Sequence, residues 1–238
     1  MKTSMWACLL AAASCLAAAR VCSAQDTTVT GKVILEGAAN TSAAPTVVWL
    51  MPLGAADSTP VTPMHAVLAQ KNKMFEPHLL VVTRGSSVDF PNRDPWFHNV
   101  FSLFNGKRFD LGLYEAGTSR TVRFDREGVS FIFCNIHPEM SAVVVVLGSR
   151  YFATTDKAGD FTIPEVPSGS YMLHVWNENA LPARLQALSR EVQVSDASHN
   201  LGTIRLPVTK VASLPHKNKY GQDYEPPSPN NPVYVQPQ

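Results

Sequence analysis

Residues 129–147 read VSFIFCNIHPEMSAVVVVL, and the rest of the chain is interpreted outward from this stretch. Its first six residues are mostly β-branched or aromatic, which predicts a strand that ends in Cys134. Pro138 lacks the N–H group that a sheet ladder needs, so a tight loop is predicted to follow the strand. Residues 142–147 are continuously apolar and predict a second buried strand. The sequence therefore predicts a short loop held between two core strands.

Three candidate metal ligands lie on this loop, Cys134, His137 and Met140, and a fourth, His98, lies upstream. A thiolate, imidazoles and a thioether are soft donors that favour copper, and two histidines with one cysteine and a weak axial methionine form a blue-copper electron-transfer site. Zinc is the main competing metal, but methionine is a poor zinc ligand and zinc carries no electrons. A lone buried cysteine is more often a small hydrophobic residue, so the prediction depends on the combination.

The pattern Cys-x2-His-x2-Met is similar to the ligand loop of the cupredoxins, the small blue copper proteins, and its His-Pro step resembles that of amicyanin. Upstream, residues 75–77, 81–92 and 98–100 resemble the strand pattern of plastocyanin and amicyanin. The resemblance covers residues 64–147. It implies a Greek-key cupredoxin β-sandwich that binds one type 1 copper ion per chain.

The resemblance also implies a role for each site residue. The four implied metal ligands are His98, Cys134, His137 and Met140. Asn99 falls on the asparagine that ties the two ligand-bearing loops together, and Asn135 stands where a small hydroxyl residue is common. In the family the loop histidine lies near the surface, so His137 is expected to be the route by which electrons enter and leave.

The remaining pattern of residues 64–147 agrees with an all-β sandwich. Short alternating runs are separated by turn residues, and no helical period of useful length appears. The expected strands are 79–82, 87–90, 100–103, 121–124 and 129–134. The aromatic residues near His98 are expected to pack in the core or to form an apolar collar around the metal.

Residues 1–24 are predicted to be a secretory signal peptide, with a basic start at Lys2, a short apolar core and small residues before Gln25. The apolar core is too short to predict a membrane span, and acylation of Cys15 or Cys22 is a less favoured alternative. Removal of this segment leaves Cys134 as the one remaining cysteine. We therefore expect a periplasmic or secreted protein without an internal disulfide.

Three further segments complete the chain. Residues 25–63 contain strand-like runs at 29–35 and 46–51 that could join either neighbouring unit. Residues 148–207 resemble the carboxypeptidase regulatory-like domains, which implies a smaller immunoglobulin-like or transthyretin-like β-sandwich. Residues 208–238 are rich in proline and predict a disordered tail. His78 and His216 lie in polar contexts without partners at ligand spacing.

The sequence as a whole predicts an electron carrier rather than an enzyme, with a redox partner protein. The alternatives are a copper-binding or chaperone module without redox turnover, and a scaffold protein in which the second β unit is primary. The formal net charge is +1 and basic runs are absent, so the composition does not predict nucleic-acid binding.

Overall fold

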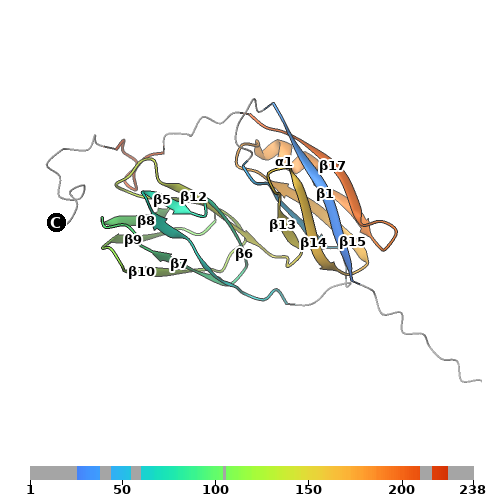
Figure 1. The fold of residues 1–238 in the computed structure, drawn as a ribbon, viewed down its shortest axis with the longest axis horizontal. Coiled ribbons are helices and arrows are strands. Elements are labelled where there is room, and N and C mark those ends of the chain that lie inside the picture. Colours follow the sequence, from blue (N-terminus) through green and yellow to red (C-terminus); the bar gives the residue numbers. More distant parts are fainter. Residues whose placement is uncertain (1–25, 38–43, 55–59, 104–105, 210–215, 225–238) are drawn as a thin grey trace, which may run out of the picture.

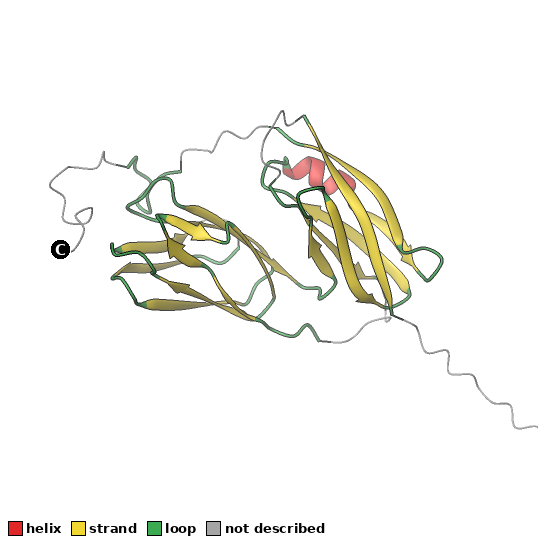
Figure 2. Cartoon of the chain, viewed as in Figure 1, coloured by secondary structure: helices red, strands yellow, loops and turns green. Residues whose placement is uncertain are grey.

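The computed structural model describes residues 26–37, 44–54, 60–103, 106–209 and 216–224. Over these residues the chain is all-β apart from one short helix, and its strands form two units that lie side by side (Figures 1 and 2). We call residues 64–147 the inserted unit, and residues 27–53 together with 148–208 the outer unit. The predicted signal peptide lies outside the described residues. Within them, no helix has the length and hydrophobicity that a membrane crossing requires.

The inserted unit is built from short strands in two main sheets. One sheet has the order β6-β12-β11-β8-β9 and the other has the order β10-β7-β3, while β4 and β5 form a hairpin. The strands are β3 (His65–Val67), β4 (Ala69–Lys71), β5 (Met74–Glu76), β6 (Leu79–Thr83), β7 (Ser86–Pro91), β8 (His98–Ser102), β9 (Phe109–Tyr114), β10 (Ser119–Phe124), β11 (Gly128–Phe133) and β12 (Ser141–Leu147).

The centre of the inserted unit is the antiparallel pair that the sequence predicts. β11 pairs with β12 from Gly128 opposite Val146 to Phe133 opposite Ser141, and β12 pairs on its other side with β6 in parallel. Residues 134–140 connect the two strands, so the predicted ligand loop leaves from the middle of the larger sheet. β8 is the next strand beyond β11, which places the start of β8 near this loop.

The outer unit combines both ends of the described chain. Its sheets have the orders β14-β1-β17 and β13-β2-β15-β16. The strands at 29–35 and 46–51, which the sequence left open, therefore pair with the second unit, and residues 64–147 are inserted between β2 and β13. The elements are β1 (Thr27–Glu36), β2 (Val47–Pro52), β13 (Phe152–Thr154), β14 (Asp160–Val166), β15 (Gly169–Trp176), α1 (Pro182–Leu188), β16 (Arg190–Val194) and β17 (Asn200–Pro207).

The two units share an apolar contact centred on β12. Alternate residues of this strand, such as Val144, pack into the core of the inserted unit. The residues between them, Val143, Val145 and Leu147, join a second cluster. This cluster includes Val47 and Trp176 of the outer unit. A strand that is covered on both faces needs apolar residues at every position. This contact explains why the run at 142–147 is continuously apolar.

Candidate metal centre

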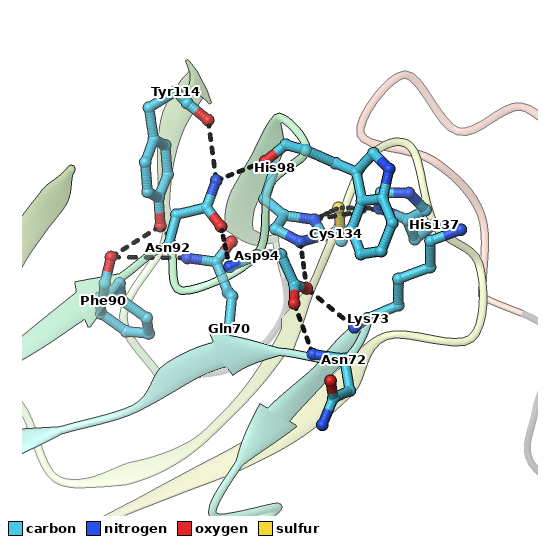
Figure 3. A network of polar contacts seen from close by, with 11 residues as sticks. Gln70, Asn72, Lys73, Phe90, Asn92, Asp94, His98, Tyr114, Cys134 and His137 are labelled. Atoms are coloured by element: carbon cyan, nitrogen blue, oxygen red, sulfur yellow. Dashed lines mark hydrogen bonds and ion pairs between the residues drawn. The ribbon is translucent and has the colours of Figure 1, made fainter. Parts of the chain in front are cut away.

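Three predicted ligands meet in one cluster (Figure 3). His98 is the first residue of β8, Cys134 directly follows β11, and His137 lies in the loop before β12. The Nδ1 atoms of the two histidines are 3.1 Å apart, and the Cys134 Sγ atom is 3.6 Å from Nδ1 of His137 and 3.9 Å from Nδ1 of His98. All three side chains are almost fully buried. The strand order brings together residues that are 36 positions apart.

The triangle formed by these three atoms has the size of a metal site. A point equidistant from the atoms lies about 2.1 Å from each, compared with metal–nitrogen and metal–sulfur bonds of about 2.0 to 2.3 Å. Among the described residues this is the one group of three or more histidine, cysteine and acidic side chains at such distances. The donor set therefore fits a single trigonally bound ion.

Met140 closes the ligand loop. Its backbone N–H donates to the carbonyl of His137 at 3.1 Å, and its own carbonyl accepts the N–H of Cys134 at 3.3 Å. The side chain is fully buried and belongs to the same core cluster as Cys134. The loop thus returns on itself within seven residues, and the methionine lies on its inner side.

Asp94 holds His98 from behind. The His98 Nε2 atom lies 2.8 Å from Oδ2 of Asp94, whose carboxylate also accepts the backbone N–H groups of Asn72 and Lys73 at 2.6 and 2.8 Å (Figure 3). Because a carboxylate only accepts, the proton of the neutral imidazole is assigned to Nε2. The lone pair of Nδ1 then points towards Cys134 and His137, as metal ligation requires.

Burial sets the protonation of the ligands. It lowers the pKa of His98, against the effect of Asp94, and lowers the pKa of His137 to about 4 with smaller contributions from the charges of His98 and Lys73. Both imidazoles are therefore neutral at pH 7, and the contact of His98 with Asp94 is a hydrogen bond to a carboxylate rather than an ion pair. Burial also raises the pKa of the Cys134 thiol, so this proton must leave when a metal binds.

Backbone amides favour the thiolate. The N–H groups of Asn99, Ile136 and His137 lower the pKa of Cys134, although burial has the larger and opposite effect. An amide that donates to sulfur stabilises the anion and not the neutral thiol. The ligand loop and β8 thus both provide donors for a negatively charged sulfur.

The side chain of Asn99 differs from the expectation, and that of Asn135 contacts a distant segment of the chain. The side-chain Nδ2 of Asn99 donates to Oδ1 of Asp110 at 2.7 Å and to the carbonyl of Gly112 at 3.0 Å, so it ties β8 to β9. The Oδ1 atom of Asn135 accepts the backbone N–H of Lys219 at 2.9 Å. The side-chain tie between the ligand loops that the resemblance implied is not among the hydrogen bonds of the described residues, and Asn99 acts on Cys134 through its backbone instead.

The expectation that His137 lies near the surface is wrong. Its relative exposure is 1%, and residues 216–224 lie against the loop on both sides of it. These residues belong to the segment that the composition predicted to be disordered. Asp94, His216 and Tyr224 were missed by the sequence analysis. Asp94 had one signal, its position four residues before a histidine. His216 and Tyr224 come from a proline-rich stretch without periodicity.

Comparisons with known proteins match parts of the chain. A family model described as polysaccharide lyase family 4, domain II, matches residues 140–200, which run from the end of the ligand loop to the start of β17. No curated protein matches the chain.

Among solved structures, several copper proteins are similar to part of the chain. An amicyanin variant is 24% identical, with a TM-score of 0.33, over 35% of this chain and 82% of its own. A purple cupredoxin from Nitrosopumilus maritimus is 27% identical, with a TM-score of 0.30, over 41% of this chain and 95% of its own. Each of these similarities covers less than half of the present chain. The outer unit is a second β-sandwich.

A copper-containing nitrite reductase from Thermus scotoductus SA-01 is also similar, at 21% identity and a TM-score of 0.35 over 42% of this chain. The present chain spans only 28% of that enzyme. The similarity therefore covers a minor part of that enzyme and does not extend to its activity.

Proposed function

We propose that the chain is a type 1 copper protein that transfers single electrons, with His98, Cys134, His137 and Met140 as the metal ligands. The observation that carries the proposal is the convergence of two imidazole nitrogens and one buried sulfur around a single point, with a buried methionine on the same loop. This donor set is soft and suits copper better than zinc.

A bound copper ion would supply the change between Cu(I) and Cu(II). The residues of the chain keep the donors fixed during this change. β8 and β11 belong to one sheet and hold His98 and Cys134 from two neighbouring strands, while Asp94 fixes the ring of His98. Ligands held in this way need little rearrangement when an electron arrives or leaves.

The depth of the site favours electron transfer over copper delivery. Metal exchange with a partner requires access to the ligands, yet the three converging ligand residues are exposed by no more than 1%. Electrons can cross a covering layer of protein, whereas an ion cannot. We therefore propose a carrier that meets a redox partner protein. We also propose a location outside the cytoplasm, supported by the signal-like pattern of residues 1–24.

Removal of the thiolate tests the metal site. Copper-loaded, oxidised protein is expected to show an intense visible thiolate-to-copper band, and Cys134→Ser is expected to abolish this band while copper still binds weakly. The measurements are the visible spectrum and the copper content of each protein. If the oxidised, copper-loaded wild type lacks the band, the proposal is wrong. If the protein binds zinc and does not bind copper, the site is a zinc site instead.

Replacement of the axial donor tests the assignment of Met140. Met140→Gln introduces a harder donor, which favours Cu(II), so the reduction potential is expected to fall while copper is retained. Met74→Gln is the matched control, because Met74 is 53% exposed on β5. Equal potentials for the two variants in a voltammetric measurement would show that Met140 is not an axial ligand.

A further inference from the structure

We propose that residues 216–224, which we call the strap, hold the ligand loop closed, with His216 and Tyr224 as positioning residues. The strap follows β17 in sequence but lies beside the inserted unit rather than the outer unit (Figure 1). Its action on the loop follows from contacts within the chain. Its effect on copper rests on the proposed function.

Two strap side chains bind backbone carbonyls of the loop. The Tyr224 hydroxyl donates to the carbonyl of Cys134 at 2.7 Å, and the His216 Nε2 atom donates to the carbonyl of Pro138 at 2.7 Å. These two carbonyls lie on either side of His137. The Tyr224 hydroxyl also lies 3.1 Å from Nδ1 of His216, so the two strap side chains are in contact with each other.

Ring stacking adds a third attachment. The imidazole of His216 stacks on the ring of Phe133, with centroids 4.0 Å apart and an angle of 28° between the planes. Phe133 is the last residue of β11 and directly precedes Cys134. The strap therefore covers the point where the strand becomes the ligand loop, and stacked rings of this kind stabilise a contact beyond the area that they bury.

Lys219 connects the strap to the other ligand strand. Its backbone N–H donates to Asn135, and its Nζ atom lies 2.7 Å from Oδ2 of Asp110, whose Oδ1 accepts from Asn99. Asn99 is the neighbour of His98. One short segment thus contacts the loop that carries two converging ligands and, through Asp110, the strand that carries the third.

The consequence is a loop held from both sides. The core of the inserted unit supports it from within through Cys134 and Met140, and the strap supports it from outside at Phe133, Asn135 and Pro138. Outer contacts that orient metal ligands affect both metal affinity and redox potential. Loss of the strap contacts should let the loop open more often and expose the Cys134 sulfur.

Alkylation of Cys134 in the copper-free chain measures this opening directly. Iodoacetamide reaches the buried thiol only when the loop opens, and peptide mass spectrometry reports modification at this cysteine alone. Tyr224→Phe is expected to raise the alkylation rate about two- to tenfold, the effect of one lost hydrogen bond. Tyr220→Phe is the matched control, because it removes a hydroxyl that contacts Lys219 from a 71% exposed tyrosine of the same segment and leaves the bond to the Cys134 carbonyl in place.

A pair of variants at His216 separates its two roles. His216→Phe keeps a ring against Phe133 but cannot donate to Pro138, whereas His216→Ala loses both contacts, so alkylation should be faster in the alanine variant. Lys219→Met is a further variant that leaves the Cys134 carbonyl untouched. Alkylation at wild-type rates in all the strap variants would overturn the proposal.

The copper-loaded protein provides the second readout. Tyr224→Phe is expected to speed copper loss to a chelator and to shift the reduction potential, while Tyr220→Phe changes neither. If the chain binds no copper, the proposed function fails and the alkylation result still decides whether the strap holds the loop. If copper binds and neither quantity differs between the two variants, the positioning role is wrong.

Discussion

Asp94 illustrates how much of the site depends on one side chain that is not a ligand. Burial raises the pKa of its carboxyl group, but the N–H groups of Lys73 and Asn72 and the ring of His98 outweigh this effect and lower it. The side chain is 4% exposed and accepts all three of these donors, so it stays charged behind the metal site. A buried negative charge next to a ligand favours Cu(II) over Cu(I).

Asp94→Asn is therefore expected to weaken copper binding and to raise the reduction potential. The asparagine amide can accept through one atom only, so its N–H group would face a backbone donor or the ring of His98. Loss of a hydrogen bond that orients a metal ligand typically lowers metal affinity by about 10- to 100-fold. A change of about 1.4 kcal/mol between the two redox states corresponds to about 59 mV for one electron. Competition with a chelator and voltammetry measure the two effects.

Asp156→Asn is the control for this substitution. Asp156 also accepts two backbone N–H groups, from Ala158 and Asp160, but lies in a turn of the outer unit. Its replacement should leave both the copper affinity and the potential unchanged. A potential for Asp94→Asn that equals or falls below that of the wild type would contradict the assigned role of the carboxylate.

At the scale of elements, β12 could be predicted from sequence and its surroundings could not. The continuous apolar run at 142–147 identifies a strand covered on both faces, and the structure confirms it. The run does not say what covers the second face, because the partner residues Val47 and Trp176 lie far away in sequence. The same holds for β1, whose pairing with β14 and β17 depends on strands more than 120 residues away.

The ligand loop and the strap show the same contrast. Cys134, His137 and Met140 were predicted because their spacing and their place between two strand patterns are local features. His216 and Tyr224 contact the loop through backbone carbonyls, which every residue possesses, so the loop sequence gives no sign of them. Their segment has a composition that predicts disorder, and only the fold shows what it contacts.

The two faces of β12 make a prediction about cooperativity. Val145 packs between the units, so Val145→Asp places an unpaired carboxylate in that contact and should cost about 3 to 5 kcal/mol. Denaturant unfolding of the wild type is expected to be one transition, and that of the variant two, because the shared cluster no longer couples the units. Val67→Asp, at a 40% exposed position on β3, is the control.

Tryptophan fluorescence follows both units in this experiment. Trp49 and Trp176 belong to the contact cluster on the side of the outer unit, while Trp96 lies in the inserted unit beneath the Lys73 ammonium, which is 5.0 Å from its ring centroid. The visible band of bound copper reports the unfolding of the inserted unit alone, so it can be compared with the fluorescence signal. A single transition in Val145→Asp, coincident for both signals, would show that the cluster does not couple the units.

At the scale of the whole molecule, one polar contact also joins the two units. His78, just before β6, lies 2.8 Å from Oε2 of Glu178 in the outer unit through Nε2 and 3.1 Å from the carbonyl of Ser141 through Nδ1. Both partners only accept, so both ring nitrogens must donate and the ring is charged when both bonds are made. The hydrogen bond to Glu178 raises the pKa of His78 above its ordinary value, against the effect of burial.

This contact predicts a small pH dependence of stability with a definite sign. Because the folded-state pKa of His78 is raised, its contribution is fully present below about pH 6.5, the unfolded value, and is lost as the pH rises through the folded value. The side chain is 48% exposed, so the contribution should stay below about 1 kcal/mol. The free energy of unfolding of the wild type should therefore exceed that of His78→Gln in mild acid and approach it in mild alkali. His199→Gln controls for general effects of the substitution, because the ring of His199 contacts the carbonyl of Asp196 in its own turn rather than the other unit. A difference between the wild type and His78→Gln that stays constant over this pH range would show that the contact is made by the neutral ring.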